Sequence, residues 1–140
     1  MQRRKDYDER STVNENEIAA KIVKSAIEVH RSLGGPGLLE SIYEEAYCWE
    51  ITQSGLMVER QKVIPLHYKG NTLSTPLRLD LLVENSVIVE CKATAEYNRI
   101  FESQLLTYLH LTDLRLGLVI NFGEKLVKNG IHRVVNELPE

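Results

Sequence analysis

The sequence predicts one α/β domain in which helices flank a central mixed β-sheet. The first observation is the length of 140 residues, enough for a single domain with a core of its own. The second is the order of hydrophobic periodicities along the chain: two helical patterns, three strand-like runs, a third helix and two further strands. The third is that several strand-like runs are almost continuously apolar, as in strands covered on both faces.

Composition excludes several classes of protein. No apolar run approaches the ~20 residues that span a bilayer, and the basic N-terminus is not followed by the apolar stretch of a secretory signal. The two cysteines, Cys48 and Cys91, are too few for a disulfide framework or a zinc site of their own. We therefore expect a reduced, cytoplasmic, soluble protein. The net charge of −3 argues against a general nucleic-acid coat, but not against an enzyme with a local basic rim.

The N-terminal third predicts an arm and two helices. Residues 1–13 are polar and aperiodic, which favours a flexible arm; alternatively, Arg3, Arg4 and Lys5 contact phosphates. The folded domain is expected over residues 14–140. Asn14 and Glu17 resemble a capping box, and apolar residues then recur at helical spacing as far as residue 33. The glycines and proline of residues 34–37 end this helix.

The second helix is expected over residues 38–53. Its predicted core stripe consists of Leu39, Ile42, Ala46 and Trp49. A neighbouring face of the same helix carries two acids and two phenols, Glu40, Tyr43, Glu44 and Tyr47. This pattern favours a solvated surface with half-buried tyrosine rings; the alternative is that the face belongs to a functional site.

The rest of the chain predicts the sheet and one more helix. Residues 57–68 form a strand and residues 69–71 a turn; residues 72–83 and 87–92 complete a three-strand meander. A helix over 100–112, a buried strand over 116–122 and an edge strand over 131–135 follow.

Three charged residues interrupt apolar strands of the meander. Asp80 lies between two Leu-rich stretches, and Glu90 and Lys92 end the next strand, where they point to one face. If residues 84–86 form a three-residue loop, Asp80 falls opposite Glu90; a two-residue loop would send its carboxylate to the other side. Isolated charges are costly in a core, so the three residues form either a buried ion network or a site for a hard divalent cation such as Mg²⁺.

The chain resembles the PD-(D/E)XK nuclease superfamily. Asp80 and the Glu90-Cys91-Lys92 sequence match its motif, although Leu79 stands where the superfamily's name has proline. The segment Gly37-Leu38-Leu39-Glu40-Ser41-Ile42-Tyr43 matches the motif of the GxxExxY protein family, a prokaryotic group assigned to that superfamily. The resemblance covers roughly residues 15–135, and implies a restriction-endonuclease-like core around a nuclease site.

The resemblance also implies roles for individual residues. Asp80 and Glu90 would hold Mg²⁺, with Mn²⁺ as a substitute, together with the carbonyl of Cys91 and, directly or through water, Glu40. Lys92 would position the attacking water and stabilise charge on the phosphate. Gln104, a lone amide on an apolar helical stripe, would orient a ligand or the water, or else bond to nearby backbone.

Further candidates rest on residue type alone. Tyr43, Tyr47 and Tyr108 are candidate substrate contacts, with packing as the alternative for the first two, and His30 is expected to pack. Arg78, Arg99 and Arg115 are candidates for a basic rim.

Three functions remain open at this point. The chain is expected to be an Mg²⁺-dependent nuclease acting on DNA or RNA, a catalytically weak module that binds nucleic acid or a protein partner, or an interaction domain with a buried ion network. A homodimer would enlarge the small surface available for a duplex.

Overall fold

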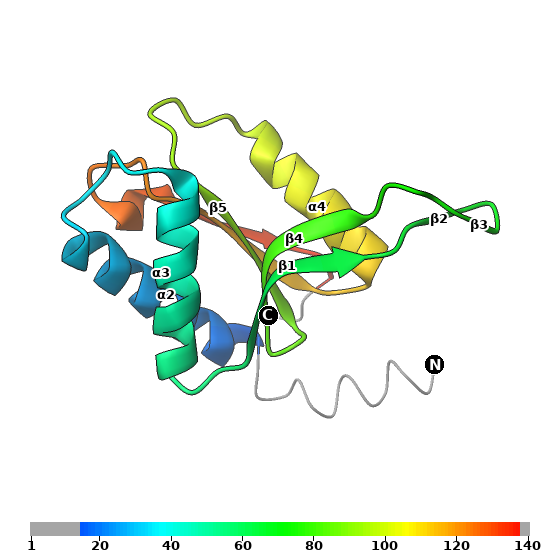
Figure 1. The fold of residues 1–140 in the computed structure, drawn as a ribbon, viewed down its shortest axis with the longest axis horizontal. Coiled ribbons are helices and arrows are strands. Elements are labelled where there is room, and N and C mark those ends of the chain that lie inside the picture. The colour runs from blue at the N-terminus through cyan, green and yellow to red at the C-terminus, as the bar shows by residue number, and fades with distance from the viewer. Residues whose placement is uncertain (1–14, 138–140) are drawn as a thin grey trace.

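The computed structural model describes residues 15–137, which form a five-stranded mixed sheet with helices on both faces (Figure 1). The predicted arm of residues 1–13 and the capping residue Asn14 lie outside the described residues. The elements, in chain order, are α2 (Glu15–Ser32), α3 (Glu40–Gln53), β1 (Val58–Ile64), β2 (His67–Tyr68), β3 (Asn71–Thr72), β4 (Leu77–Val83), β5 (Val87–Lys92), α4 (Ile100–Thr112), β6 (Leu116–Asn121), the 3-10 helix η1 (Val127–Gly130) and β7 (Ile131–Val135).

The strand order of the main sheet is β1-β4-β5-β6-β7. The pairs β1–β4, β4–β5 and β6–β7 are antiparallel, and β5 runs parallel to β6. This confirms the predicted fold class, the three-strand meander and the edge position of residues 131–135. Of the two loop lengths considered, the structure has the three-residue loop, because Val83 pairs with Val87 across residues 84–86.

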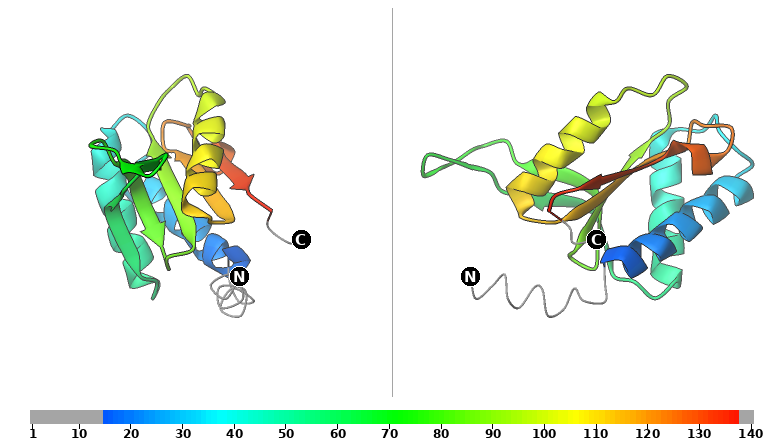
Figure 2. Two further views of the ribbon diagram at one scale, coloured as in Figure 1. Left: turned by 90° about the vertical axis from the view of Figure 1, so that its right-hand side faces the viewer. Right: turned by 180° about the vertical axis from the view of Figure 1, so that it is seen from behind.

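The sheet separates two hydrophobic layers. Helices α2 and α3 pack on one face around Ile22, Tyr47, Val89 and Leu118, whereas α4 packs on the other through Leu105 and Leu109. Figure 2 shows the sheet between α3 and α4 in its left-hand view. Each central strand is therefore covered on both faces, which explains the near-continuous apolar runs.

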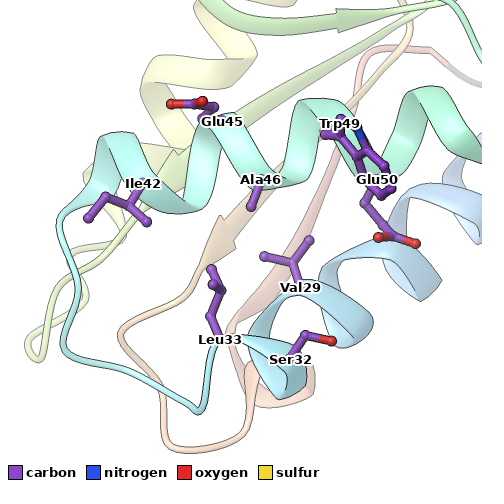
Figure 3. A pocket seen from close by; sticks show the side chains of 8 residues that line it. All are labelled: Val29, Ser32, Leu33, Ile42, Glu45, Ala46, Trp49 and Glu50. Atoms are coloured by element: carbon purple, nitrogen blue, oxygen red, sulfur yellow. The ribbon is translucent and has the colours of Figure 1, made fainter.

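The predicted core stripe of α3 is wrong. Leu39 is 71% exposed and Trp49 is 63% exposed, whereas Tyr43 and Tyr47 are fully buried. The reason is that the tyrosine rings pack on Phe122, Tyr43 at a centroid distance of 4.9 Å and Tyr47 edge-on at 5.3 Å. Two large rings bury more area than the aliphatic stripe would. Three residues of the predicted stripe, Ile42, Ala46 and Trp49, instead line a hollow against α2, shown in Figure 3 with Val29 and Leu33.

Prolines shorten two of the predicted strands. The strand expected over 57–68 divides into β1 and β2 around Pro65, and β4 begins only after Pro76. Proline has no backbone N–H to donate to the sheet, so pairing stops at both positions. The turn between β2 and β3 consists of Lys69 and Gly70, both with positive φ.

None of the helices within residues 15–137 is both long enough and apolar enough to cross a membrane.

Candidate functional site

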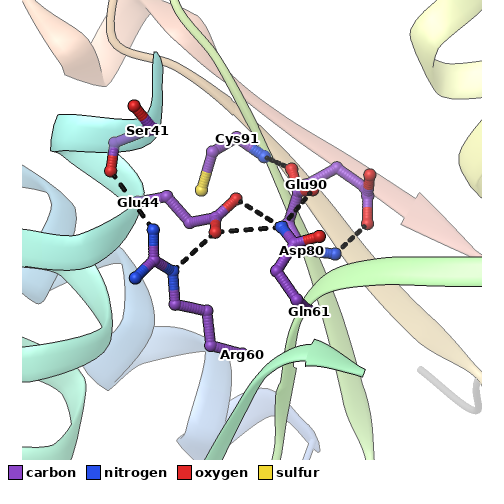
Figure 4. A network of polar contacts seen from close by, with 7 residues as sticks. All are labelled: Ser41, Glu44, Arg60, Gln61, Asp80, Glu90 and Cys91. Atoms are coloured by element: carbon purple, nitrogen blue, oxygen red, sulfur yellow. Dashed lines mark hydrogen bonds and ion pairs between the residues drawn. The ribbon is translucent and has the colours of Figure 1, made fainter. Parts of the chain in front are cut away.

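The centre of the candidate site lies where β4 and β5 stop pairing through their backbones. The ladder pairs Leu81 with Val89, and beyond it side chains replace the backbone partners. The N–H of Asp80 donates to Oε2 of Glu90 at 3.0 Å, and the N–H of Cys91 donates to Oδ2 of Asp80 at 2.8 Å (Figure 4). The structure therefore brings the two carboxylates side by side across the two strands.

Strand β4 rotates about its axis at Asp80. Leu79 packs in the α4 layer and Leu81 packs in the α2/α3 layer, although residues two apart on a regular strand share a face. The carboxylate of Asp80 is consequently reached from both sides of the sheet: from the α3 side through Gln61, and from the α4 side, where Tyr108 lies close enough to be affected by its charge.

Burial dominates the electrostatics of this pair. Desolvation and, after it, the charge of neighbouring Asp80 raise the pKa of Glu90 to about 8, against the opposing effects of the Asp80 N–H and Lys92. Desolvation also raises the pKa of Asp80; the Cys91 N–H and Lys92 lower it, and Glu44 raises it. Two buried carboxylates in contact cannot both be ionised cheaply, so Glu90 retains its proton at neutral pH unless a cation lies nearby.

Lys92 ends β5 next to the carboxylates. Its Nζ lies 4.5 Å from the centroid of the Phe101 ring on α4, a cation–π contact. Its charge favours the ionised forms of Asp80 and Glu90. Its carbonyl accepts a 2.7 Å hydrogen bond from the N–H of Phe122, which fixes the end of β5 against the end of β6.

Asn121 holds the segment that follows Lys92. Its Oδ1 accepts hydrogen bonds from the N–H groups of Thr94 and Gly123, both at 3.0 Å, and its Nδ2 donates to the carbonyl of Thr94 at 3.0 Å. The sequence signal for these hydrogen bonds is the asparagine itself, which ends an otherwise apolar, buried strand. It positions the loop that leads from the site into α4.

A second group of polar residues connects Asp80 to α3, and the sequence reasoning missed it. Buried Glu44 accepts hydrogen bonds from Nε of Arg60 at 2.7 Å and from Nε2 of Gln61 at 3.0 Å. Gln61 also donates to Oδ1 of Asp80 at 3.4 Å (Figure 4). Gln61 has a φ of 53°, so β1 is locally distorted where it faces Asp80. Glu44 lies on the same helix face as Glu40 and Tyr47. That spacing was the available sequence signal for Glu44, but the predicted core stripe assigned the buried side of the helix to other residues.

Glu40 begins α3 at the edge of the site. Its side chain is exposed, and partial desolvation raises its pKa; Lys92 lowers that pKa, whereas Asp80 and Glu44 raise it. Tyr43 fixes the preceding turn: its hydroxyl donates to the carbonyl of Gly35 at 2.6 Å and accepts from the N–H of Leu38 at 3.2 Å. The glycine-rich turn and Tyr43 together determine where the helix carrying Glu40 starts.

The remaining predicted site residues fall into two groups. On α4, Gln104 is exposed and Tyr108, one turn later, is partly buried. Burial raises the pKa of Tyr108, and the charges of Glu90 and Asp80 raise it further. Arg78 and Arg99 are exposed. Arg115, by contrast, is buried, so its expected place in a basic rim is wrong.

Tyr43 and Tyr47 pack in the core, which was the favoured alternative to a contact with substrate, and they are more deeply buried than expected. Both rings are fully buried, and the hydroxyl of Tyr47 donates to the carbonyl of Ile22 at 2.7 Å. His30 packs as expected: it is buried, its Nε2 lies 3.2 Å from the carbonyl oxygen of Phe122, and its ring stacks on Tyr43. Cys91 is buried between Glu90 and Lys92, and burial raises the pKa of its thiol.

The donors at this site are oxygen atoms of the kind that hard divalent cations prefer. One carboxylate oxygen of Asp80 and one of Glu90 accept a hydrogen bond from a backbone N–H. Each carboxylate has further lone pairs that could bind a cation. Within residues 15–137, no three His, Cys, Asp or Glu side chains already lie together as a metal cluster. The donor set therefore fits a divalent cation in its chemistry, and binding would require Glu90 to lose its proton.

Comparison with known proteins assigns the family. The family model described as the PD-(D/E)XK nuclease superfamily matches residues 16–134, which includes all of the site described above. No curated protein and no solved structure matches the chain. Because the family model covers most of the sequence, and the matched region carries Asp80, Glu90 and Lys92 in one cleft, the chain belongs to the PD-(D/E)XK nuclease superfamily.

Proposed function

We propose that the protein is an Mg²⁺-dependent nuclease that hydrolyses phosphodiester bonds in DNA or RNA at the Asp80–Glu90 cleft. The observation that carries the proposal is the reciprocal contact between these two carboxylates and the opposite strand's backbone N–H groups, with Lys92 beside them. A purely structural ion network would pair each buried carboxylate with a cation. Here Glu90 accepts from the backbone N–H of Asp80, Asp80 accepts from the backbone N–H of Cys91, and Lys92 is the adjacent cation.

The residues that would hold the cation are Asp80 and Glu90, with the carbonyl of Cys91 and the side chain of Glu40. A bound Mg²⁺, or Mn²⁺ in its place, polarises a phosphoryl oxygen and lowers the pKa of water. Glu90 is buried and Asp80 is partly buried, which limits access of bulk water and strengthens electrostatic interactions at the site.

Three other residues act on the substrate or on the attacking water in this proposal. Lys92 stabilises negative charge on the phosphate, since its ammonium lies at the cleft and is oriented by Phe101. Gln104, exposed on α4, and Tyr108, one turn further, contact the attacking water or a phosphate oxygen. Exposed Arg78 and Arg99 supply the basic rim.

The proposal extends to the GxxExxY family within the superfamily. It is supported by the role of the motif: Tyr43 bonds to the turn at Gly35 and Leu38, which sets the start of the helix that bears Glu40. The tyrosine of the motif therefore positions its glutamate, and the motif glycine, Gly37, has a φ of 114° in the turn before the helix. A cytoplasmic location and a homodimer remain predictions, the latter to be measured by light scattering.

The test compares Lys92→Ala with the parent protein and with Lys24→Ala, a control at an exposed position on α2. Each protein is incubated with single-stranded, duplex and branched DNA and RNA in Mg²⁺ or Mn²⁺. We expect cleavage by the parent and by Lys24→Ala, and a loss of ~10²–10⁴-fold in rate for Lys92→Ala. The metal-induced rise in melting temperature should persist in Lys92→Ala, because the lysine is not a ligand. Equal cleavage by all three proteins would contradict the assignment.

A second candidate is a catalytically weak module that keeps the nuclease fold and binds nucleic acid or a protein partner. The observation that favours it is that, among residues 15–137, no three-ligand cluster is already assembled. This candidate predicts that the parent cleaves none of the substrates, and that Lys92→Ala only makes nucleic-acid affinity less dependent on salt.

A further inference from the structure

A slender hairpin projects from the sheet between β1 and β4. We call residues 65–76, which include β2 and β3, the hairpin arm. Figures 1 and 2 show it extending past the rest of the molecule, with no helix alongside. All side chains from residue 67 to residue 76 are exposed, and Tyr68 is 59% exposed. Only Leu66, at the base of the arm, packs against the core, so the arm beyond it presents both faces to its surroundings.

The backbone of the hairpin arm is nonetheless well defined. Lys69 and Gly70 have φ values of 50° and 83°, as in the tight turns whose twist matches paired strands. At the base of the arm, the N–H of Leu73 donates to the carbonyl of Leu66 at 2.8 Å. The arm is therefore a preformed two-stranded ribbon.

The charge of this part of the chain differs from that of the whole. The protein has 20 acidic and 17 basic residues, but residues 60–79 contain four Lys or Arg residues and no Asp or Glu. Two of these cations are neutralised within the fold, Arg60 by Glu44 and Lys62 by Glu59. Within the described part of the chain, Lys69 and Arg78 make no ion pair; Nζ of Lys69 lies 5.4 Å from the centroid of the Tyr68 ring. The arm and its junction with β4 are thus cationic.

The arm lies at the same end of the sheet as the candidate site. Because β4 and β5 are antiparallel, the beginning of β4 lies beside the end of β5, where Lys92 is. The arm leads into β4 at Leu77, and Asp80 follows within the same strand. At ~3.3 Å per residue, the tip at Lys69 can lie at most about 36 Å along the chain from Asp80. That reach is close to one turn of a DNA duplex, about 34–36 Å.

We propose that the hairpin arm binds duplex DNA next to the bond cleaved at Asp80 and Glu90, with Lys69 and Arg78 on backbone phosphates. The proposal rests on the proposed nuclease function and adds its substrate class. A two-stranded ribbon fits the major groove of B-form DNA, about 12 Å wide, whereas the deep and narrow major groove of A-form RNA does not admit one. Tyr68, exposed beside Lys69, adds a ring that contacts the sugar–phosphate edge.

Binding is measured in EDTA, where no metal-dependent cleavage occurs, by fluorescence anisotropy across a range of salt concentrations. The probes are a DNA duplex, its single strand and an RNA duplex of the same sequence. Lys69→Ala is compared with the parent and with Lys24→Ala, which removes the same charge from exposed α2. A second variant replaces residues 67–72 with a tight Asn-Gly turn between Leu66 and Leu73, whose backbones are already hydrogen-bonded. Thermal melting verifies that each variant folds.

We expect the parent to bind duplex DNA more tightly than the other probes, and Lys69→Ala to bind it more weakly. The slope of log affinity against log salt concentration should fall in magnitude by about 0.9 in Lys69→Ala, which corresponds to the loss of one phosphate contact. The shortened arm should lose more affinity, and Lys24→Ala should match the parent. Equal affinities for all variants, or tighter binding of the parent to RNA duplex or single strands, would overturn the proposal. The nuclease function is judged separately, by metal-dependent cleavage and its loss in Lys92→Ala, so either proposal can fail alone.

Discussion

At the scale of single residues, the proton on Glu90 governs the site. Burial raises its pKa to about 8, against 4.5 for an ordinary glutamate, and Asp80 contributes to the shift. Between these two pH values the folded protein binds a proton that the unfolded chain releases. In metal-free protein this contribution to the free energy of unfolding is therefore full below pH 4.5 and is lost as pH rises through about 8.

Glu90→Gln removes this titration. We expect the melting temperature of the parent in EDTA to fall between pH 4.5 and pH 8 more steeply than that of Glu90→Gln. Asp80, whose pKa is also raised by burial, keeps a smaller dependence of the same sign in the variant. The measurement is calorimetric melting across this pH range; identical pH dependence in both proteins would show that Glu90 is ionised throughout.

The buried carboxylate of Glu44 makes a second residue-scale prediction. It accepts hydrogen bonds from Arg60 and Gln61, whereas neighbouring Glu45 on the same helix is exposed. Glu44→Gln removes the charge-assisted bond to Arg60 and puts an NH2 donor where Gln61 donates, so we expect a loss of ~1–3 kcal/mol in the free energy of unfolding. Glu45→Gln is the matched control and should change it by less than about 0.5 kcal/mol. Equal effects in urea denaturation would mean that the Glu44 network does not stabilise the fold.

At the scale of elements, the sequence was most informative where backbone pairing and apolar runs decide the outcome. The limits of β5 and α4 follow from residue pattern, whereas the sequence narrowed the loop that brings Asp80 beside Glu90 only to two or three residues. The orientation of α3 did not follow, because two phenol rings on Phe122 outweighed an aliphatic stripe. The part played by Gln61 had no sequence signal, since it depends on a positive φ within a strand.

The turn before α3 provides a test at this scale. Tyr43→Phe keeps the ring on Phe122 but removes the hydroxyl that bonds to Gly35 and Leu38. We expect a loss of ~1–2 kcal/mol in the free energy of unfolding, because two hydrogen bonds that fix the turn disappear. Tyr68→Phe, at an exposed tyrosine, should leave it unchanged within about 0.5 kcal/mol. If both substitutions had the same effect, the hydroxyl of Tyr43 would have no role in fixing the turn.

At the scale of the whole molecule, the fold separates its charges. Asp80 from β4 and Glu90 from β5 lie side by side, and Glu40 at the start of α3 is near enough for the charge of Asp80 to raise its pKa. The hairpin arm at the same end of the sheet is cationic. An anionic cleft that lacks a cation is electrostatically unfavourable, whereas a cationic rim attracts an anionic polymer. The overall charge of −3 therefore says little about the surface that a substrate meets.

The central claim, that Asp80 and Glu90 form a divalent-metal site, is tested most directly by melting the parent and Asp80→Asn over a series of Mn²⁺ concentrations up to the millimolar range. A ligand that binds only the folded state raises its melting temperature by mass action. We predict a rise for the parent that grows with Mn²⁺ concentration, and almost none for Asp80→Asn, which in EDTA should melt at or above the parent's temperature because one repelling carboxylate is gone. No rise in the parent, or an equal rise in both proteins, would contradict the claim.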